Sequence, residues 1–186
     1  MGTLSYGMTA SLDGFVNSAD GTFDWGTPDE EVHDFIIEQQ QRIGTYLIGR
    51  RMFETMRVWD EDDFVAGMEE PYVQFTPIWR AADKIVFSSS LEDPGIPRTW
   101  VERSLDVDAI RRLKESSAKD LEVAGPTLGA AFLRAGIVDE LCLYIAPVVV
   151  GGGTRLFQDG LALELALLEE RRFDSGTVFL RYGVLS

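Results

Sequence analysis

Three turns in this sequence carry residue types that bind phosphate groups. Each follows a short strand-like run: Gly49-Arg50-Arg51 follows residues 46–48, Ser88-Ser89-Ser90 follows residues 84–87, and Ala124-Gly125-Pro126-Thr127 follows residues 121–123. In an α/β sheet, ligands sit beyond the carboxyl ends of strands, where backbone N–H groups and helix N-termini face a crevice. Arginines, hydroxyls and a glycine turn at three such ends predict a cradle for a phosphorylated dinucleotide, and therefore an enzyme.

The two arginines are informative because the chain is strongly acidic, with a formal net charge of −14. Such a charge repels an anionic cofactor at long range, so a phosphate site must be locally basic. Arg50 and Arg51 also open an expected helix, where the helix dipole disfavours cations by about 0.3–1 kcal/mol each. A bound anion would account for them; the alternative interpretation is a solvated charge pair.

Other catalytic chemistry has little support in the sequence. The one histidine, His33, falls on an expected helix, and no Gly-x-Ser-x-Gly elbow is present. Cys142 lies in an apolar run typical of a core strand, and one histidine with one cysteine cannot build a zinc cluster of imidazoles and thiolates. No metal site is therefore predicted. Gly151-Gly152-Gly153 lacks the Lys-Ser/Thr of a P-loop and indicates a flexible turn.

Length and composition indicate one globular domain over residues 1–186, with 45% apolar residues. No apolar run approaches the roughly 20 residues of a membrane helix, and the first residues do not resemble a signal peptide. A single cysteine offers no intramolecular disulfide, so we expect a cytoplasmic protein. The acidic balance argues against nucleic acid as a partner.

Strand-like and helix-like segments alternate along the chain. Residues 4–10 read as a strand, residues 13–26 as a loop, and residues 29–42 as a helix with an apolar stripe and an N-cap signal. Further helices are expected over residues 50–56, 69–81, 106–116 and 126–135, and a β-rich run over 139–150 is interrupted by Pro147. Two last strands, 163–173 and 177–185, flank the turn Asp174-Ser175-Gly176. The pattern predicts an α/β fold: a mixed sheet with helices packed on it, closing in an antiparallel hairpin.

Seven blocks in order resemble one superfamily. They are Ser11-Leu12-Asp13-Gly14-Phe15, Asp24-Trp25, Leu47-Ile48-Gly49-Arg50-Arg51-Met52-Phe53-Glu54, Lys84-Ile85-Val86-Phe87-Ser88, Val123-Ala124-Gly125-Pro126-Thr127-Leu128, Gly136-Ile137-Val138-Asp139-Glu140-Leu141, and Pro147-Val148-Val149-Val150-Gly151-Gly152-Gly153-Thr154-Arg155-Leu156-Phe157. Together they resemble the dihydrofolate-reductase-like superfamily. Within it, they are most similar to the reductase domain of the bifunctional riboflavin-biosynthesis deaminase/reductase and its stand-alone bacterial relatives.

The resemblance implies a central, mostly parallel eight-stranded sheet with NADPH lying across the strand ends. It implies that the Gly-Arg turn and the serines meet the cofactor phosphates, that the glycine turn lets the cofactor approach the backbone, and that the first loop covers the nicotinamide. The corresponding cofactor-binding residues are Gly49, Arg50, Arg51, Ser88, Ser89, Ala124, Gly125, Pro126, Thr127, Leu12 and Gly14. Many relatives have glycine at Ala124, and dihydrofolate reductases have threonine at Met52, so we expect a modified grip on the cofactor.

Reduction of a C=N bond also needs a proton donor near the hydride acceptor. In dihydrofolate reductases the acid follows a Trp-x-x-Pro-x-acid pattern, which Trp25, Pro28 and Glu30 reproduce. We therefore take Glu30 as the candidate acid, with Asp29 second and Asp13 as a group that could orient a substrate hydroxyl. Helix capping alone is the alternative explanation for acids at this position. Trp25 could stack on a flat heterocycle or cover the core.

The resemblance implies an NADPH-dependent reductase of a pyrimidine or pterin-like heterocycle, most like 5-amino-6-(5-phosphoribosylamino)uracil reductase. Arg155, beside Thr154, or Arg103 would hold the substrate phosphate. The zinc motif of the deaminase half is absent, so the bifunctional activity is not expected. The alternatives are dihydrofolate reduction, a non-catalytic nucleotide- or flavin-binding protein on the same fold, or a structural dimer module. A homodimer is also implied, with residues 141–150 as its candidate interface.

Overall fold

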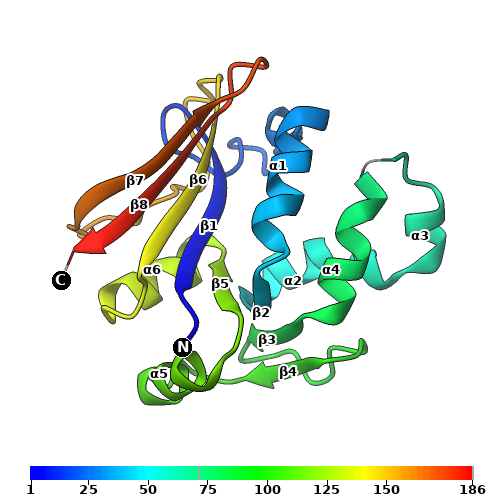
Figure 1. Cartoon of the computed structure of the whole chain (residues 1–186), viewed down its shortest axis with the longest axis vertical. Helices are drawn as coiled ribbons and strands as arrows, with labels where there is room; N and C mark the ends of the chain where they lie inside the picture. The colour runs from blue at the N-terminus through cyan, green and yellow to red at the C-terminus, as the bar shows by residue number, and fades with distance from the viewer. Residues whose placement is uncertain (71, 186) are drawn as a thin grey trace.

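One eight-stranded sheet organises the chain, in the strand order β4-β3-β2-β5-β1-β6-β8-β7 (Figure 1). The computed structural model describes residues 1–70 and 72–185. The strands are β1 (Leu4–Ser11), β2 (Ile43–Gly49), β3 (Asp83–Phe87), β4 (Thr99–Glu102), β5 (Asp120–Ala124), β6 (Glu140–Ala146), β7 (Glu164–Arg172) and β8 (Val178–Leu185). The first six strands of that order pair in parallel, whereas β8 pairs antiparallel with both β6 and β7. The expected α/β fold with a closing antiparallel hairpin is confirmed.

Helices cover both faces of the sheet. They are α1 (Glu30–Gln40), α2 (Arg50–Met56), α3 (Asp62–Ala66), α4 (Phe75–Ala81), α5 (Val107–Ser116) and α6 (Pro126–Arg134), with short 3-10 turns η1 (Asp24–Gly26), η2 (Arg57–Asp60) and η3 (Tyr72–Gln74). Figure 1 shows α1 and α4 on one side of the sheet and α5 and α6 on the other. On the α1 side, Phe53 and Trp79 pack with β2 and β3 residues, and Phe35 packs on Tyr144 and Phe179. The other face buries a separate apolar cluster under α5 and α6.

Local chemistry sets where the main helices begin. The Asp29 carboxylate accepts a hydrogen bond from Val32 N at 2.9 Å, and Asp106 caps α5 through Ala109 N at 2.9 Å. Helix α6 begins with Pro126 directly after Gly125, whose φ of 100° suits a residue without a Cβ. These caps satisfy backbone donors that have no partner within their helices.

Two predicted elements differ in the structure. The helix expected over residues 69–81 is regular only from Phe75, after the turn η3; residue 71 lies outside the described residues. Pro77 is tolerated because it stands in the first turn of α4, where its missing N–H has no intrahelical acceptor. The four-residue strand β4 was not expected; it lies at the edge of the sheet and exposes Trp100.

Strand β6 lies inside the sheet rather than at its edge. The predicted interruption at Pro147, a strand end or a bulge, is a strand end, since β6 stops at Ala146. Strand β6 is hydrogen-bonded to β1 on one side and to β8 on the other. A second subunit therefore cannot extend the sheet at residues 141–146, and edge-to-edge pairing there is ruled out as a dimer contact. The edge strands are β4 and β7.

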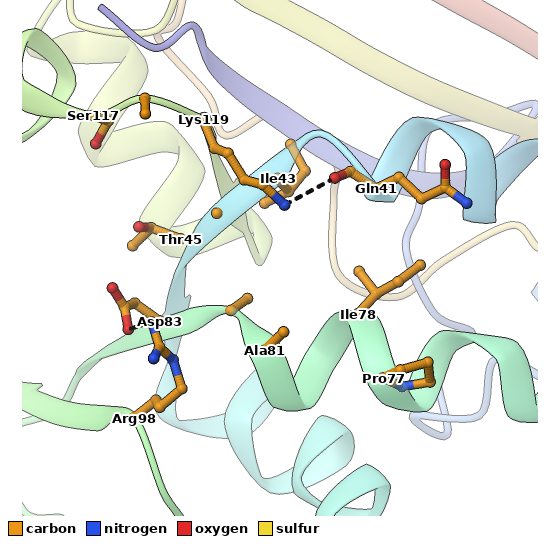
Figure 2. A pocket seen from close by; sticks show the side chains of 13 residues that line it. Gln41, Ile43, Thr45, Pro77, Ile78, Ala81, Asp83, Arg98, Ser117 and Lys119 are labelled. Carbon is orange, nitrogen blue, oxygen red and sulfur yellow. Dashed lines mark hydrogen bonds and ion pairs between the residues drawn. The ribbon is translucent and has the colours of Figure 1, made fainter.

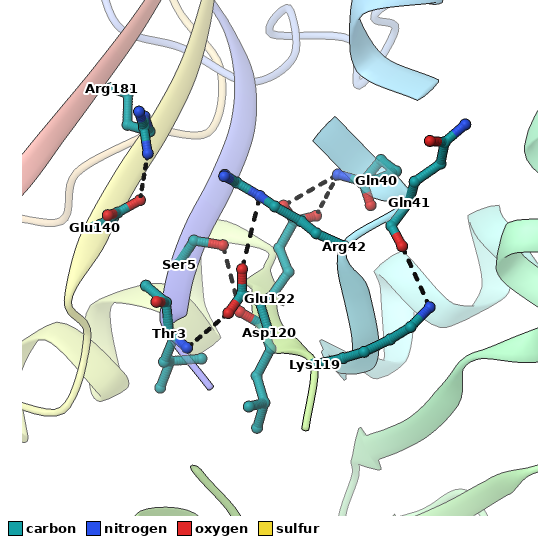
Figure 3. A network of polar contacts seen from close by, with 12 residues as sticks. Thr3, Ser5, Gln40, Gln41, Arg42, Lys119, Asp120, Glu122, Glu140 and Arg181 are labelled. Carbon is teal, nitrogen blue, oxygen red and sulfur yellow. Dashed lines mark hydrogen bonds and ion pairs between the residues drawn. The ribbon is translucent and has the colours of Figure 1, made fainter. Parts of the chain in front are cut away.

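A polar network lies between α1 and the centre of the sheet (Figure 3). Gln40 Nε2 donates to both carboxylate oxygens of Glu122 at 3.1 Å, and the Tyr46 hydroxyl donates to Gln40 Oε1 at 2.7 Å. Glu122 is partly exposed to solvent, but its carboxylate packs against the backbone of Gly7. A Cβ added to Gly7 would lie 2.6 Å from Glu122 Oε2. Enclosure of the carboxylate raises the pKa of Glu122 to about 7.

No helix in the described residues is long and apolar enough to cross a membrane.

Candidate functional site

The predicted phosphate-binding turns lie side by side at the carboxyl ends of the parallel strands. Strands β3, β2, β5, β1 and β6 are neighbours in this order and run parallel, so the turns after them emerge side by side. With neighbouring strands about 4.8 Å apart, the row from the β3 turn to the β6 turn is about 19 Å long. The strand order therefore places the candidate cofactor residues next to one another at the carboxyl ends of the strands.

The cationic part of this row is the turn after β2. Arg50 Nη1 donates to Ser90 Oγ at 2.7 Å and Arg50 Nε donates to Glu54 Oε1 at 2.7 Å, so this arginine joins the β2 and β3 turns. Arg51 is exposed, and the structure gives its guanidinium no ion pair among the described residues. Gly49 precedes α2 without a side-chain cap, which leaves the first N–H groups of the helix uncovered.

The three serines after β3 do different things. Ser88 is buried, and its hydroxyl oxygen accepts from Ser90 N at 3.3 Å and Leu91 N at 3.0 Å, which shapes the turn. Arg103 Nη1 donates to the carbonyl of Ser88 at 2.9 Å, so Arg103 supports this turn as well. Ser89 and Ser90 are exposed. Sequence reasoning assigned Ser88 and Ser89; the contact of Ser90 with Arg50 was not foreseen, because it joins separate strands.

The turn after β5 offers a helix N-terminus without a side chain over it. Gly125 is the N-cap of α6, and the first intrahelical bond runs from Gly129 N to Gly125 O at 2.8 Å. Gly125 N donates to Met8 Sδ at 3.2 Å, and a Cβ on Gly125 would meet only Met52 Cβ, at 3.9 Å. Met8 and Met52 therefore flank this turn, Met52 at the position where dihydrofolate reductases have threonine, and the space above Gly125 is open.

The loops after β1 and β6 are joined into one unit. The Asp13 carboxylate accepts from Val150 N at 3.1 Å and Gly151 N at 2.8 Å, and a hydrogen bond from Ser11 and these backbone bonds lower the pKa of Asp13. Thr154 N donates to Asn17 Oδ1 at 2.8 Å. Arg155 lies over the Phe15 ring, with its guanidinium carbon 5.3 Å from the ring centroid. The contacts of Asp13, Thr154 and Arg155 thus hold the two loops together.

Beside this unit, Leu12 exposes an apolar side chain at the end of β1. Its exposed fraction is 69%, and Val149 on the adjoining loop is 66% exposed. The loops touch here, since Leu12 N donates to Val148 O at 2.8 Å. Exposed aliphatic groups at a strand-end crevice are suited to contact a flat ring. Gly14 has a φ of 82°, which lets the loop turn back after Asp13.

A narrow pocket lies between α1 and the ends of β1 and β6. Trp25 and Pro28 line it from the loop, Val32 and Ile36 from α1, and Thr9 and Tyr144 from the sheet. Trp25 is held by a hydrogen bond from Nε1 to Ser18 Oγ at 3.0 Å. The pocket has a volume of about 20 Å³, about that of one water molecule, so it must widen before a heterocycle can enter. Thr9 and Tyr144 were not predicted; the period-two alternation of each strand was the signal available for them.

The two candidate acids at the start of α1 differ in their contacts. Asp29 and Glu30 are both exposed and both follow Pro28, which lines the pocket. The Asp29 carboxylate is used as the N-cap, whereas no hydrogen bond or ion pair in the described residues involves the Glu30 side chain. Glu30 is thus the acid with a carboxylate available for other chemistry.

A larger cleft, of about 650 Å³, opens at the opposite end of the strands, among the amino ends of β2, β3 and β5 (Figure 2). None of the predicted site residues lines it. Its cations have partners: Arg98 Nη2 is 2.7 Å from Asp83 Oδ1, and Lys119 Nζ donates to Gln41 O at 3.3 Å. Within residues 1–70 and 72–185, no three histidine, cysteine or acidic side chains are placed to hold a metal ion.

Comparisons with known proteins agree with this architecture. The model of the family described as RibD C-terminal domain matches residues 3–179. The uncharacterized protein YyaP of Bacillus subtilis (strain 168) is 29% identical over 182 residues, which cover 94% of this chain and 91% of that protein.

Two solved structures show the same fold. A protein from Shewanella sp. PV-4 assigned to riboflavin biosynthesis superposes with a TM-score of 0.76 at 19% identity, with full coverage of both chains. The deaminase/5-amino-6-(5-phosphoribosylamino)uracil reductase of Thermotoga maritima superposes with a TM-score of 0.69 at 16% identity. The match covers 99% of this chain and 57% of the Thermotoga protein.

Proposed function

This chain belongs to the RibD C-terminal domain family, a family of reductases, and we propose that it is an NADPH-dependent reductase of a pyrimidine- or pterin-like heterocycle. The observation that carries the proposal is the row of turns at the carboxyl ends of the strands, cationic at Arg50 and Arg51 and apolar at Leu12. Such a row matches a ligand with phosphates at one end and a flat ring at the other.

The residues present fit this cofactor. The open space above Gly125 and the bare N-terminus of α6 can receive a pyrophosphate, because a Cβ there would meet only Met52. Arg50, Arg51, Ser89 and Ser90 would hold the adenosine phosphate, and the Leu12 to Gly14 turn would cover the nicotinamide. When bound, NADPH supplies the hydride.

The chain's own groups would position the substrate and deliver the proton. The substrate ring would enter beside Trp25, between α1 and the ends of β1 and β6. Glu30 begins α1 next to this pocket and is the proposed source of the proton, directly or through a water. Asp29 would fix the start of the helix and so the position of Glu30.

The experiment that tests this function is a titration of the purified protein with NADPH and, separately, NADH, followed by quenching of its four tryptophans. Micromolar binding of NADPH with a clear preference over NADH supports a phosphate-reading reductase. Absence of saturable binding of either would contradict it and favour a binding protein on the same fold. Inhibition by antifolates would instead favour dihydrofolate as the substrate.

We also expect a homodimer, and the exposed edge strand β7 is the surface where a contact could form. Leu167 and Leu168 on this strand are 50% and 51% exposed. Sedimentation of the protein together with a Leu167→Glu, Leu168→Glu variant tests this expectation. A monomeric wild-type protein would contradict it.

A further inference from the structure

The sheet opens between β1 and β5 at the carboxyl ends of these two strands. Their parallel pairing ends at Tyr6 and Val123, although β1 stays paired with β6 as far as Ser11 and β5 stays paired with β2 at Ala124. In a continuing parallel ladder, the next backbone N–H groups of β5 would find carbonyl oxygens on β1. Because the pairing has ended there, a backbone N–H just beyond β5 needs a different acceptor.

The side chain of Met8 supplies that acceptor. Gly125 N donates to Met8 Sδ at 3.2 Å, and Met8 is partly buried against the apolar cluster under α5 and α6. A thioether sulfur is an uncharged and weak acceptor. An oxygen of an anion forms a stronger, charge-assisted hydrogen bond with the same kind of donor. The Gly125 N–H is therefore occupied, but by a partner that an anion can replace.

The Gly125 N–H is one of few donors that this turn can offer to a ligand. Pro126 has no N–H, and no side chain caps the start of α6 at Gly125. The first intrahelical bond begins at Gly129 N, so Thr127 N precedes it and has no acceptor within the helix. A Cβ on Gly125 would meet Met52 Cβ at 3.9 Å, so the space over this residue is open. A phosphate group at the turn would thus meet the donor that Met8 already holds.

We propose that Met8 competes with the cofactor pyrophosphate for the Gly125 N–H and so limits how tightly the cofactor is held. The inference rests on the proposed function and adds a positioning residue to its cofactor site. On cofactor binding, Gly125 N exchanges the Met8 thioether for a pyrophosphate oxygen. The affinity then reflects the difference between the two hydrogen bonds rather than the whole of the stronger one. On cofactor release, Met8 again satisfies the Gly125 N–H, which keeps the turn in its conformation with a φ of 100°.

Met8→Leu tests the competition, because leucine has a similar volume and no acceptor atom. We expect Met8→Leu to bind NADPH about threefold more tightly than the wild type, since a hydrogen bond of the free protein no longer has to break. NADH should gain by the same factor, because the two cofactors share the pyrophosphate. A purely structural role for Met8 predicts weaker binding of both cofactors instead. Met56→Leu, the same change at a partly buried position on α2, is the matched control and should leave both dissociation constants unchanged.

Nuclear magnetic resonance of the wild-type protein observes the same exchange without relying on a variant. Saturation with NADPH should shift both the amide proton of Gly125 and the methyl group of Met8, because the two groups lose contact with each other. In the cofactor-free protein, the Gly125 amide should exchange with solvent faster in Met8→Leu than in the wild type. A Met8 methyl signal that stays in place at saturation, or equal exchange rates of the Gly125 amide, would overturn the inference.

The titrations also separate a failure of this inference from a failure of the proposed function. Equal or weaker NADPH binding by Met8→Leu overturns the competition and leaves the reductase standing. Absence of NADPH binding by both the wild type and Met8→Leu overturns the reductase and, with it, the competition. Tighter binding of NADPH and NADH by Met8→Leu, with Met56→Leu unchanged, supports both proposals.

Discussion

Arg50 Nη1 donates a hydrogen bond to Ser90 Oγ at 2.7 Å, which joins the turn after β2 to the turn after β3. Glu54, one turn further along α2, accepts from Arg50 Nε at 2.7 Å. The guanidinium is therefore held at the cationic part of the strand-end row before any anion arrives. Preorganisation of this kind makes a phosphate contact stronger, because less side-chain freedom is lost on binding.

Replacement of Arg50 by alanine should weaken NADPH binding about tenfold or more while changing NADH binding little. The arginine would contact the 2′-phosphate that distinguishes the two cofactors, and a charged hydrogen bond is worth about 1.5–3 kcal/mol. The two dissociation constants are measured by tryptophan fluorescence. Arg111→Ala, which removes an exposed arginine from α5, is the matched control. Equal losses for both cofactors would show that Arg50 does not read this phosphate.

Gly125→Ala and Gly49→Ala should differ in how much folding stability they cost, because only Gly125 has a positive φ. Gly125 has a φ of 100°, so a Cβ there should cost about 1–3 kcal/mol of stability. Gly49 has a φ of −75° and open space around it, so its substitution should cost less than about 1 kcal/mol. Thermal and denaturant unfolding of the two variants measures the difference. Equal destabilisation would contradict the backbone geometry assigned to Gly125.

Asp29→Ala and Glu30→Gln should affect different properties. Asp29 caps α1, and loss of such a cap costs about 1 kcal/mol of folding stability. Glu30 has an exposed carboxylate at the first position of α1, so its amide variant should keep the wild-type stability and NADPH affinity. As the proposed proton source, Glu30 should nevertheless lose turnover by about 10²-fold or more in Glu30→Gln. Steady-state kinetics beside unfolding curves checks both variants. Unchanged turnover in Glu30→Gln would remove it from the mechanism.

Local sequence signals predicted most of the fold. Asp106 and Pro126 marked helix starts, Pro147 marked the end of β6, and the turn at residues 174–176 marked the closing hairpin. The miss at β4 has a physical cause. Strand β4 has four residues and lies at the edge of the sheet, so it is held in place mainly by its pairing with β3. Four residues are too few to show the alternation of apolar and polar side chains that predicts a strand.

The candidate site was predictable by position but not by contact. Parallel strands bring Arg50, Ser88 and Gly125 to the same end of the strands, and strand–turn–helix patterns are enough to foresee this. Whether Ser88 or Ser90 meets Arg50 depends on how a turn folds, and the burial of Ser88 decides it. The role of Asp13 in joining two loops depends on its bonds with Val150 and Gly151, which lie 137 and 138 residues further along the chain. Local sequence patterns do not reveal such distant contacts.

Glu122 makes the stability of this protein depend on pH in a direction opposite to that of most carboxylates. Enclosure raises its pKa from the ordinary 4.5 to about 7 in the folded protein, although the Gln40 hydrogen bonds act the other way. Between these values the unfolded chain loses the Glu122 proton and the folded chain keeps it. The Glu122 contribution is therefore fully present below pH 4.5 and is lost as the pH rises to about 7.

Glu122→Gln imitates the protonated carboxyl group and removes this titration. The variant should match the wild type near pH 4.5 and exceed it by on the order of 2 kcal/mol above pH 7, since its amide oxygen can still accept from Gln40. Urea unfolding at a series of pH values, taken as the difference between variant and wild type, measures the effect and cancels the other carboxylates. Glu115→Gln, an exposed change on α5, should show no such trend. A difference that stays constant with pH, or falls as the pH rises, would mean that the Glu122 carboxylate is already ionised in the folded protein.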